Sequence, residues 1–139
     1  METPTPQEAL VYLMVIVSAA DREMRDEELA RIGAIIRTLP VFDGFPQSRT
    51  LNVAQECQQL LHDEHGLDGV LALAASALNE AMRETAYALV VDVAAADHSL
   101  NLEEARMLDI VRERLGIDAD VVEAIERVAA IRHRTLPVQ

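Results

Sequence analysis

The sequence of 139 residues contains no lysine and no tryptophan, and only 3% of its residues are aromatic. It has a single cysteine, Cys57, which excludes an internal disulfide and suits a reducing compartment. Half of the residues are hydrophobic, and a core of Ala, Val, Leu and Ile with so few aromatics is typical of packed helices. Glycine-rich phosphate loops, nucleophile elbows and paired cysteines are also missing, so we expect a protein that is not an enzyme.

Long hydrophobic runs are absent as well. The longest one, residues 9–20, falls short of the roughly 20 residues that a membrane-spanning helix needs, so it predicts a buried core helix. The start of the chain carries an acid, Glu2, where a secretory signal needs positive charge. We therefore expect a cytoplasmic protein with no transmembrane segment.

The charge of the chain is strongly one-sided. Its net charge is −12, and all twelve basic residues are arginines. An acidic surface repels the phosphate backbone, which argues against a nucleic-acid partner. It suits a metal cation or a basic protein partner instead. A small basic patch near the C-terminus does not reverse this interpretation; it consists of Arg127, Arg132, His133 and Arg134.

The most prominent pattern is an internal repeat. A shift of 97 − 21 = 76 residues superposes the segments 13–29 and 89–105, including Ala-Ala-Asp at 19–21 on Ala-Ala-Asp at 95–97. It also superposes the paired glutamates Glu27-Glu28 on Glu103-Glu104. Each copy predicts an apolar helix, an aspartate, a short loop and a second helix that opens with the glutamates. The repeat therefore predicts two pseudo-symmetric halves.

The periodicity of apolar residues predicts an all-α protein of about seven helices in one domain, residues 1–139, with a core over about 6–133. Apolar spacing and cap residues place the helices at about 6–20, 26–38, 48–64, 69–78 and 79–96, followed by two that begin after Asn101 and Asp118.

Several details of these helices follow from single residues. Gly66 is expected just beyond the third helix and Asp68 at the cap of the fourth. Phe42 and Phe45 are expected to fold back onto the core, and Leu51 lies on the apolar stripe of the third helix. In the last helix the side chains expected to pack inward are Val121, Val122, Ile125, Val128, Ala129 and Ile131.

Asp21 and Asp97 are the most informative residues of the repeat. Each falls where a helix should end, and an acid beside the last carbonyl groups of a helix is unfavourable by up to about 1 kcal/mol. One explanation is a turn in which the carboxylate accepts backbone N–H groups, and the other is a bound cation. Both stay open, and the turn is the simpler.

The repeated glutamates have their own local explanation. Glu104 follows Asn101 by three residues, so a capping box explains it. The matching position before Glu28 is Arg25, which cannot accept a backbone N–H, so Asp26 is an alternative cap. Glu27 and Glu103 are ordinary acids of a first helical turn.

The alternative to these local roles is a divalent-metal site. Its candidate ligands are Asp21, Glu28, Asp97 and Glu104, and such hard oxygen ligands suit Ca²⁺, Mg²⁺ or Mn²⁺. The spacing of the acids is not that of an EF-hand.

Other titratable residues have simple structural interpretations. His62 and His65 have a spacing that could bind Zn²⁺, but a helix C-terminus explains them more simply. Cys57 lies on an apolar stripe and is interpreted as a core residue. Asp92 interrupts an apolar helix and is expected on a solvated edge.

With its repeated Ala-Ala-Asp and Glu-Glu segments, the chain resembles the TerB family of tellurite-resistance-associated helical domains over about residues 8–132. Leu78, Arg83, Ala86 and the segment 115–117 also resemble the family, whereas Arg22 and His98 replace its glycines. The resemblance implies two pseudo-symmetric helical halves and a role in tellurite or other chemical stress, through membrane-associated or metal-sensing protein complexes. It also implies divalent metal at the four acids named above.

We therefore expect a non-enzymatic TerB-like stress-response module that acts by binding protein partners. The alternative is a divalent-metal-binding protein that uses the repeated acidic loops.

Overall fold

The computed structural model describes residues 3–19, 24–96 and 102–137. Within these ranges the chain forms seven α-helices and no strand, which confirms the expected all-α fold. The helices are α1 (Pro6–Ala19), α2 (Asp26–Thr38), α3 (Thr50–His62), α4 (Gly66–Ser76), α5 (Glu80–Ala96), α6 (Leu102–Leu115) and α7 (Ala119–Arg132). Two short 3₁₀ turns, Pro40–Phe42 and Gln47–Arg49, connect α2 to α3.

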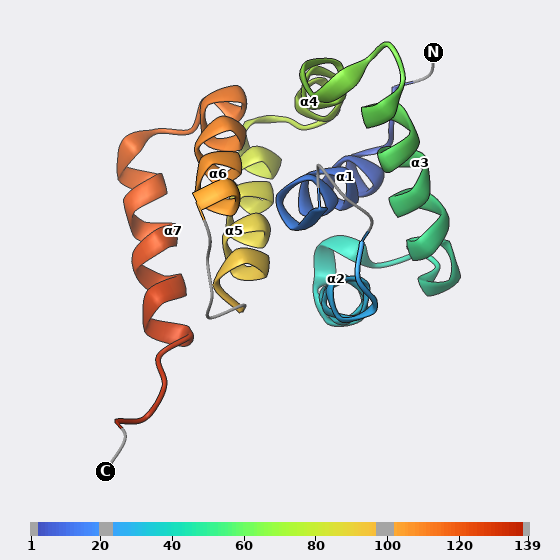
Figure 1. The fold of residues 1–139 in the computed structure, drawn as a ribbon. Coiled ribbons are helices and arrows are strands. Elements are labelled where there is room, and N and C mark those ends of the chain that lie inside the picture. Colours follow the sequence, from blue (N-terminus) through green and yellow to red (C-terminus); the bar gives the residue numbers. More distant parts are fainter. Residues whose placement is uncertain (1–2, 20–23, 97–101, 138–139) are drawn as a thin grey trace.

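Helix α1 lies at the centre of the molecule. Every residue from Ala9 to Ala19 is buried, because α1 packs against α3 and α4 on one side and against α5 and α6 on the other (Figure 1). Helix α5 in turn packs against α6 and α7. A helix enclosed in this way must be apolar nearly all round, as the sequence of α1 is. None of the helices in the described part of the chain is long and apolar enough to cross a membrane.

The predicted helix starts are partly confirmed. At α1 the backbone N–H of Thr5 donates to Oε1 of Glu8 at 2.9 Å, and the N–H of Glu8 donates to Oγ1 of Thr5 at 3.1 Å, which is a complete capping box at the predicted helix start. At α5 the N–H of Met82 donates to Oδ1 of Asn79 at 2.8 Å. Gly116 ends α6 with a φ of 63°, a conformation that glycine adopts without strain.

Other predicted boundaries are wrong. Helix α3 begins at Thr50 rather than near Ser48, because the 3₁₀ turn Gln47–Arg49 precedes it. Gly66 does not end α3; it is the first residue of α4, with a φ of 59°. Asp68 therefore lies within the first turn of α4 and is not its cap.

The core contains most of the expected residues. Phe42 and Phe45 fold back onto it, 2% and 9% exposed, with their rings in edge-to-face contact at 5.9 Å. Cys57 is fully buried, and this burial raises the pKa of its thiol to about 12. Three residues expected in the core are instead about half exposed, namely Leu51 (49%), Val128 (53%) and Ile131 (47%).

Candidate functional site

The glutamates of the first repeat lie in the opening turn of α2. Arg25 holds the cap position in an extended conformation, and its backbone N–H donates to Oε1 of Glu28 at 2.9 Å. Asp26 is the first helical residue, so the alternative of Asp26 as the cap is wrong. Half of a capping box is thus formed, because Glu28 satisfies a helix-start N–H group while Arg25 offers no acceptor in return.

In the second repeat, Glu103 and Glu104 lie in the first turn of α6. Glu103 is exposed and Glu104 is half buried. The matching glutamates of α2 have the same burial, since Glu27 is exposed and Glu28 is half buried. Negative side chains are favourable there because of the helix dipole. Asp21, Asp97 and the expected cap Asn101 lie outside the described residues, so the four-acid metal site stays a prediction.

Over 3–19, 24–96 and 102–137, no group of three or more His, Cys, Asp and Glu side chains could hold a metal ion. His62 and His65 do not form such a group with other described residues. Instead, Nδ1 of His65 lies 2.8 Å from Oδ1 of Asp63. The backbone N–H of His65 also donates to this oxygen, and these contacts lower the pKa of Asp63.

The four-acid hypothesis makes a calorimetric prediction. If Asp21 and Asp97 ligate a cation with Glu28 and Glu104, titration with Ca²⁺, Mg²⁺ or Mn²⁺ gives saturable heat that the double variant Asp21→Asn/Asp97→Asn removes.

A matched control has the same change of charge elsewhere, Asp43→Asn/Asp118→Asn, at two exposed positions. The control must retain the heat of the wild type. An absence of heat with every ion would rule out the metal site.

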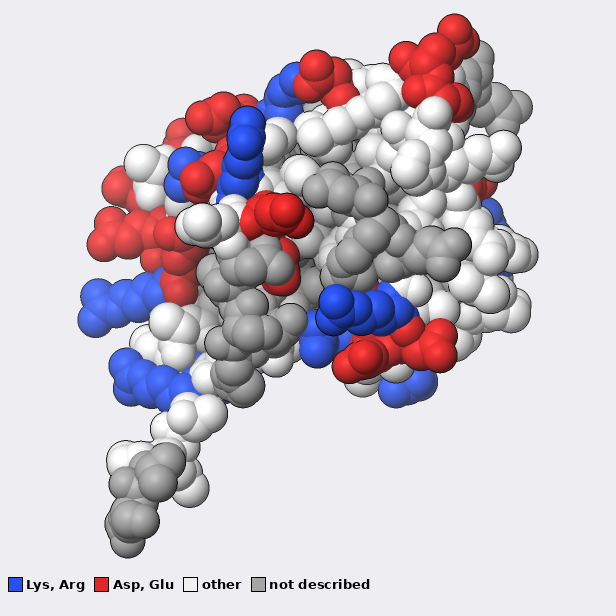
Figure 2. All heavy atoms as spheres, viewed as in Figure 1, with Lys and Arg blue, Asp and Glu red and all other residues white. Residues whose placement is uncertain are grey.

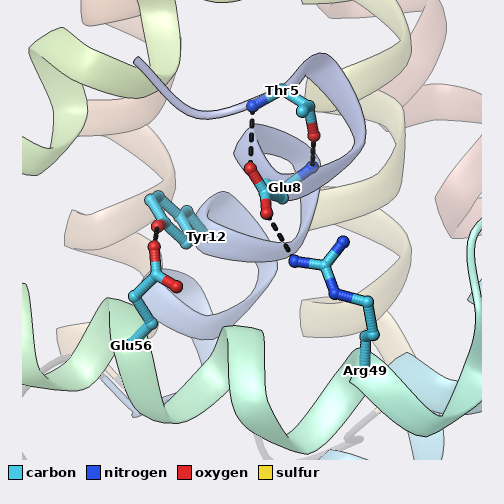
Figure 3. Close-up of polar contacts among 5 residues, drawn as sticks. All are labelled: Thr5, Glu8, Tyr12, Arg49 and Glu56. Atoms are coloured by element: carbon cyan, nitrogen blue, oxygen red, sulfur yellow. Dashed lines mark hydrogen bonds and ion pairs between the residues drawn. The ribbon is translucent and has the colours of Figure 1, made fainter. Parts of the chain in front are cut away.

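Each of the two central helices carries a buried tyrosine that hydrogen-bonds to a glutamate of a neighbouring helix. The hydroxyl of Tyr12 in α1 donates to Glu56 of α3 (Figure 3). The hydroxyl of Tyr87 in α5 donates to Oε2 of Glu126 in α7 at 2.6 Å. Burial and the adjacent carboxylate raise the pKa of both phenols, so they stay protonated at neutral pH. The pairs tie α3 and α7 to the central helices.

A second contact of α1, with Arg49 at the end of the 3₁₀ turn that precedes α3, lies beside the Tyr12 pair. Nη2 of Arg49 lies 2.7 Å from Oε2 of Glu8, the glutamate of the capping box (Figure 3). Partial burial disfavours the charged form of Glu8, but the hydrogen bonds from Thr5 and Arg49 outweigh it, and the pKa of Glu8 is lowered. Glu8 is therefore negatively charged at neutral pH, and its carboxylate holds the start of α1 and Arg49 together.

Asp92 joins α5 to the end of α7. Nη1 of Arg132 lies 3.1 Å from its Oδ2, and Nε2 of His133 lies 3.2 Å from its Oδ1. The Asp92 side chain is 22% exposed, so it lies on a partly solvated edge as expected. An acid that interrupts an apolar helix is explained here by its two basic partners in the described part of the chain.

Two surface depressions flank α7. A groove of about 500 Å³ between α5 and α7 is mainly apolar and includes Leu89 and Val128. A hollow of about 370 Å³ between the end of α6 and α7 carries three carboxylates, those of Glu113, Glu123 and Glu126, beside Arg112. Acidic side chains gather over the α6 and α7 side of the molecule in Figure 2. Three carboxylates around one guanidinium give the hollow a net negative charge.

Comparison with known proteins gives one family. The family model described as tellurite resistance protein TerB matches residues 7–127, which include all seven helices apart from Pro6 of α1 and the last residues of α7. No curated protein and no solved structure matches the chain significantly.

Proposed function

Because the chain belongs to the TerB family, we propose that it is a non-enzymatic helical module of the response to tellurite or other chemical stress, and that it works by binding another protein. The observation that carries the proposal is the acidic hollow between α6 and α7, with Glu113, Glu123 and Glu126 around one Arg112. A basic segment of a partner would gain charge-assisted hydrogen bonds there.

The state of the reactive side chains supports a role without chemistry. The thiol of Cys57 is buried, and its pKa is raised to about 12. The hydroxyls of Tyr12 and Tyr87 donate to glutamates and also have raised pKa values. Such groups are poor nucleophiles and poor general acids or bases at neutral pH.

The test removes charge beside the hollow. Glu113 of α6 and Glu123 of α7 are exposed residues that line it, and the variant Glu113→Gln/Glu123→Gln removes two of its three carboxylates. In a host strain that lacks the wild-type gene, we expect this variant to restore growth on tellurite less well than the wild type does. The immobilised variant should also retain less of the partner at low salt.

The control variant, Asp43→Asn/Glu64→Gln, removes the same charge at exposed positions away from α6 and α7. It should behave like the wild type in both assays. If deletion of the gene leaves growth under tellurite and other chemical stresses unchanged, the stress role is wrong. If the wild type retains no protein at low salt, the binding role is wrong.

A further inference from the structure

The face of α7 beside its groove with α5 has apolar side chains that the rest of the chain leaves partly exposed. Val122 and Ala129 face the core and are 7% and 6% exposed, whereas Val128 and Ile131 are 53% and 47% exposed. Ala124 is also exposed. All five of these residues are apolar. Ala124, Val128 and Ile131 therefore form a second apolar face that the other described helices leave uncovered.

This second face has the spacing of a coiled-coil seam. The residues Val121, Ala124, Val128 and Ile131 follow one another at intervals of three, four and three residues, which is the a/d pattern of a heptad. Helix α7 has 14 residues and is therefore about 21 Å long, enough for these four layers. A seam of this kind packs against another helix.

The charges of α7 specify which helix fits. Its beginning is acidic, with Asp118 and Asp120, and its end is basic, with Arg132 and Arg134; all four are exposed. In Figure 2 acidic side chains gather over the upper part of the α6 and α7 side, and arginine side chains lie lower, toward the C-terminal tail. A second α7 that runs antiparallel brings the acidic start of each helix beside the basic end of the other.

We propose that two copies of this chain associate through an antiparallel pair of α7 helices related by a twofold axis. Val128 of each copy lies opposite Ala124 of the other, and Val121 lies opposite Ile131. With this register Asp118 and Asp120 lie beside Arg134 and Arg132 of the second copy. The interface is isologous, as in most homodimers, and does not use the acidic side of α6.

The experiment measures the mass of the full-length chain as a function of concentration by sedimentation equilibrium. The wild type should approach twice the monomer mass of 15.3 kDa at high concentration. The variant Ile131→Glu should weaken the dimer tenfold or more, because it places a charge against Val121 of the second copy at both ends of the apolar seam. A matched control, Leu51→Glu, changes an equally exposed leucine of α3 and should leave the dimer unchanged.

A charge reversal tests the direction of the pairing. The single variants Asp118→Arg and Arg134→Asp should each weaken the dimer, because each puts like charges at both ends of the interface. The double variant Asp118→Arg/Arg134→Asp should restore it. A chain that stays monomeric at about 100 µM, a dimer that Ile131→Glu leaves intact, or a double variant weaker than both single variants would overturn the proposal.

Discussion

Replacing Leu10 with alanine is expected to lower the free energy of unfolding by about 2–5 kcal/mol, the range measured when large aliphatic side chains are truncated in a packed core. Leu10 is fully buried in α1, and α1 contacts helices of both sides of the molecule. The surrounding helices cannot all move to fill the cavity, so the loss should fall in the upper half of this range. Urea unfolding followed by circular dichroism measures it.

The control is Leu51→Ala in α3, a substitution of the same type at a site that is 49% exposed. This control is expected to lower the free energy of unfolding by no more than about 1 kcal/mol, because the side chain is already half exposed and its truncation removes few packing contacts. Equal losses for the two variants would contradict the central position of α1. A change in the slope of the Leu10→Ala transition would instead point to a changed compactness of the denatured or native state, or to a transition that is not two-state.

The sequence predicts the central helix well because its apolar pattern fits only one environment, the enclosed core. A run of about a dozen apolar residues is too short for a membrane and too apolar for a surface helix, so it must be enclosed. The boundaries of α2 and α5 are predicted for a related reason, as Pro40 stops the first and Asn79 caps the second. Local rules suffice wherever one residue determines a boundary.

The sequence fails where the outcome depends on the amount of surface that is covered. Periodicity assigns Val122, Val128 and Ile131 alike to a buried side of α7, but α5 covers only part of that side. The pattern identifies an apolar face and does not say how many neighbours it has. The start of α3 fails differently, because the 3₁₀ turn Gln47–Arg49 has no signal distinct from that of a helix.

The polar contacts between helices were outside the reach of local rules. Tyr12 and Glu56 are 44 residues apart in the sequence, and Tyr87 and Glu126 are 39 apart. A single tyrosine within each apolar helix was the available signal, since a buried hydroxyl requires a partner. For the candidate metal site, the sequence supplies its four acids, of which Glu28 and Glu104 are placed in helix-start turns.

Replacing Arg83 with methionine is expected to lower the free energy of unfolding by about 1.5–3 kcal/mol. Arg83 is a residue of α5 whose guanidinium lies against the ends of two other helices. Its Nη2 donates to the carbonyl of Ala75, near the end of α4, at 2.7 Å, and its Nε donates to the carbonyl of Leu78, just beyond α4, at 3.1 Å. Its Nη1 lies 3.5 Å from the carbonyl of Leu115, the last residue of α6.

The size of this effect follows from the position of the carbonyls. The last carbonyl groups of a helix lack helical partners and carry the negative end of its dipole, so a cation there is doubly favourable. Arg83 is only partly buried, and water can replace some of its bonds, which keeps the loss at a few kcal/mol. Methionine retains a long apolar side chain, so the loss of stability measures the missing hydrogen-bond donors and not a cavity.

Two further variants separate this role from that of a positive charge. Arg83→Lys keeps the charge but has no planar fork of donors, so it should recover only part of the stability. Arg106→Met removes an exposed arginine of α6 and should change the free energy of unfolding by less than about 0.5 kcal/mol. If Arg83→Lys were as stable as the wild type, the positive charge alone would account for the contribution of Arg83 to stability. If Arg83→Met were also as stable as the wild type, the guanidinium would not join α4, α5 and α6.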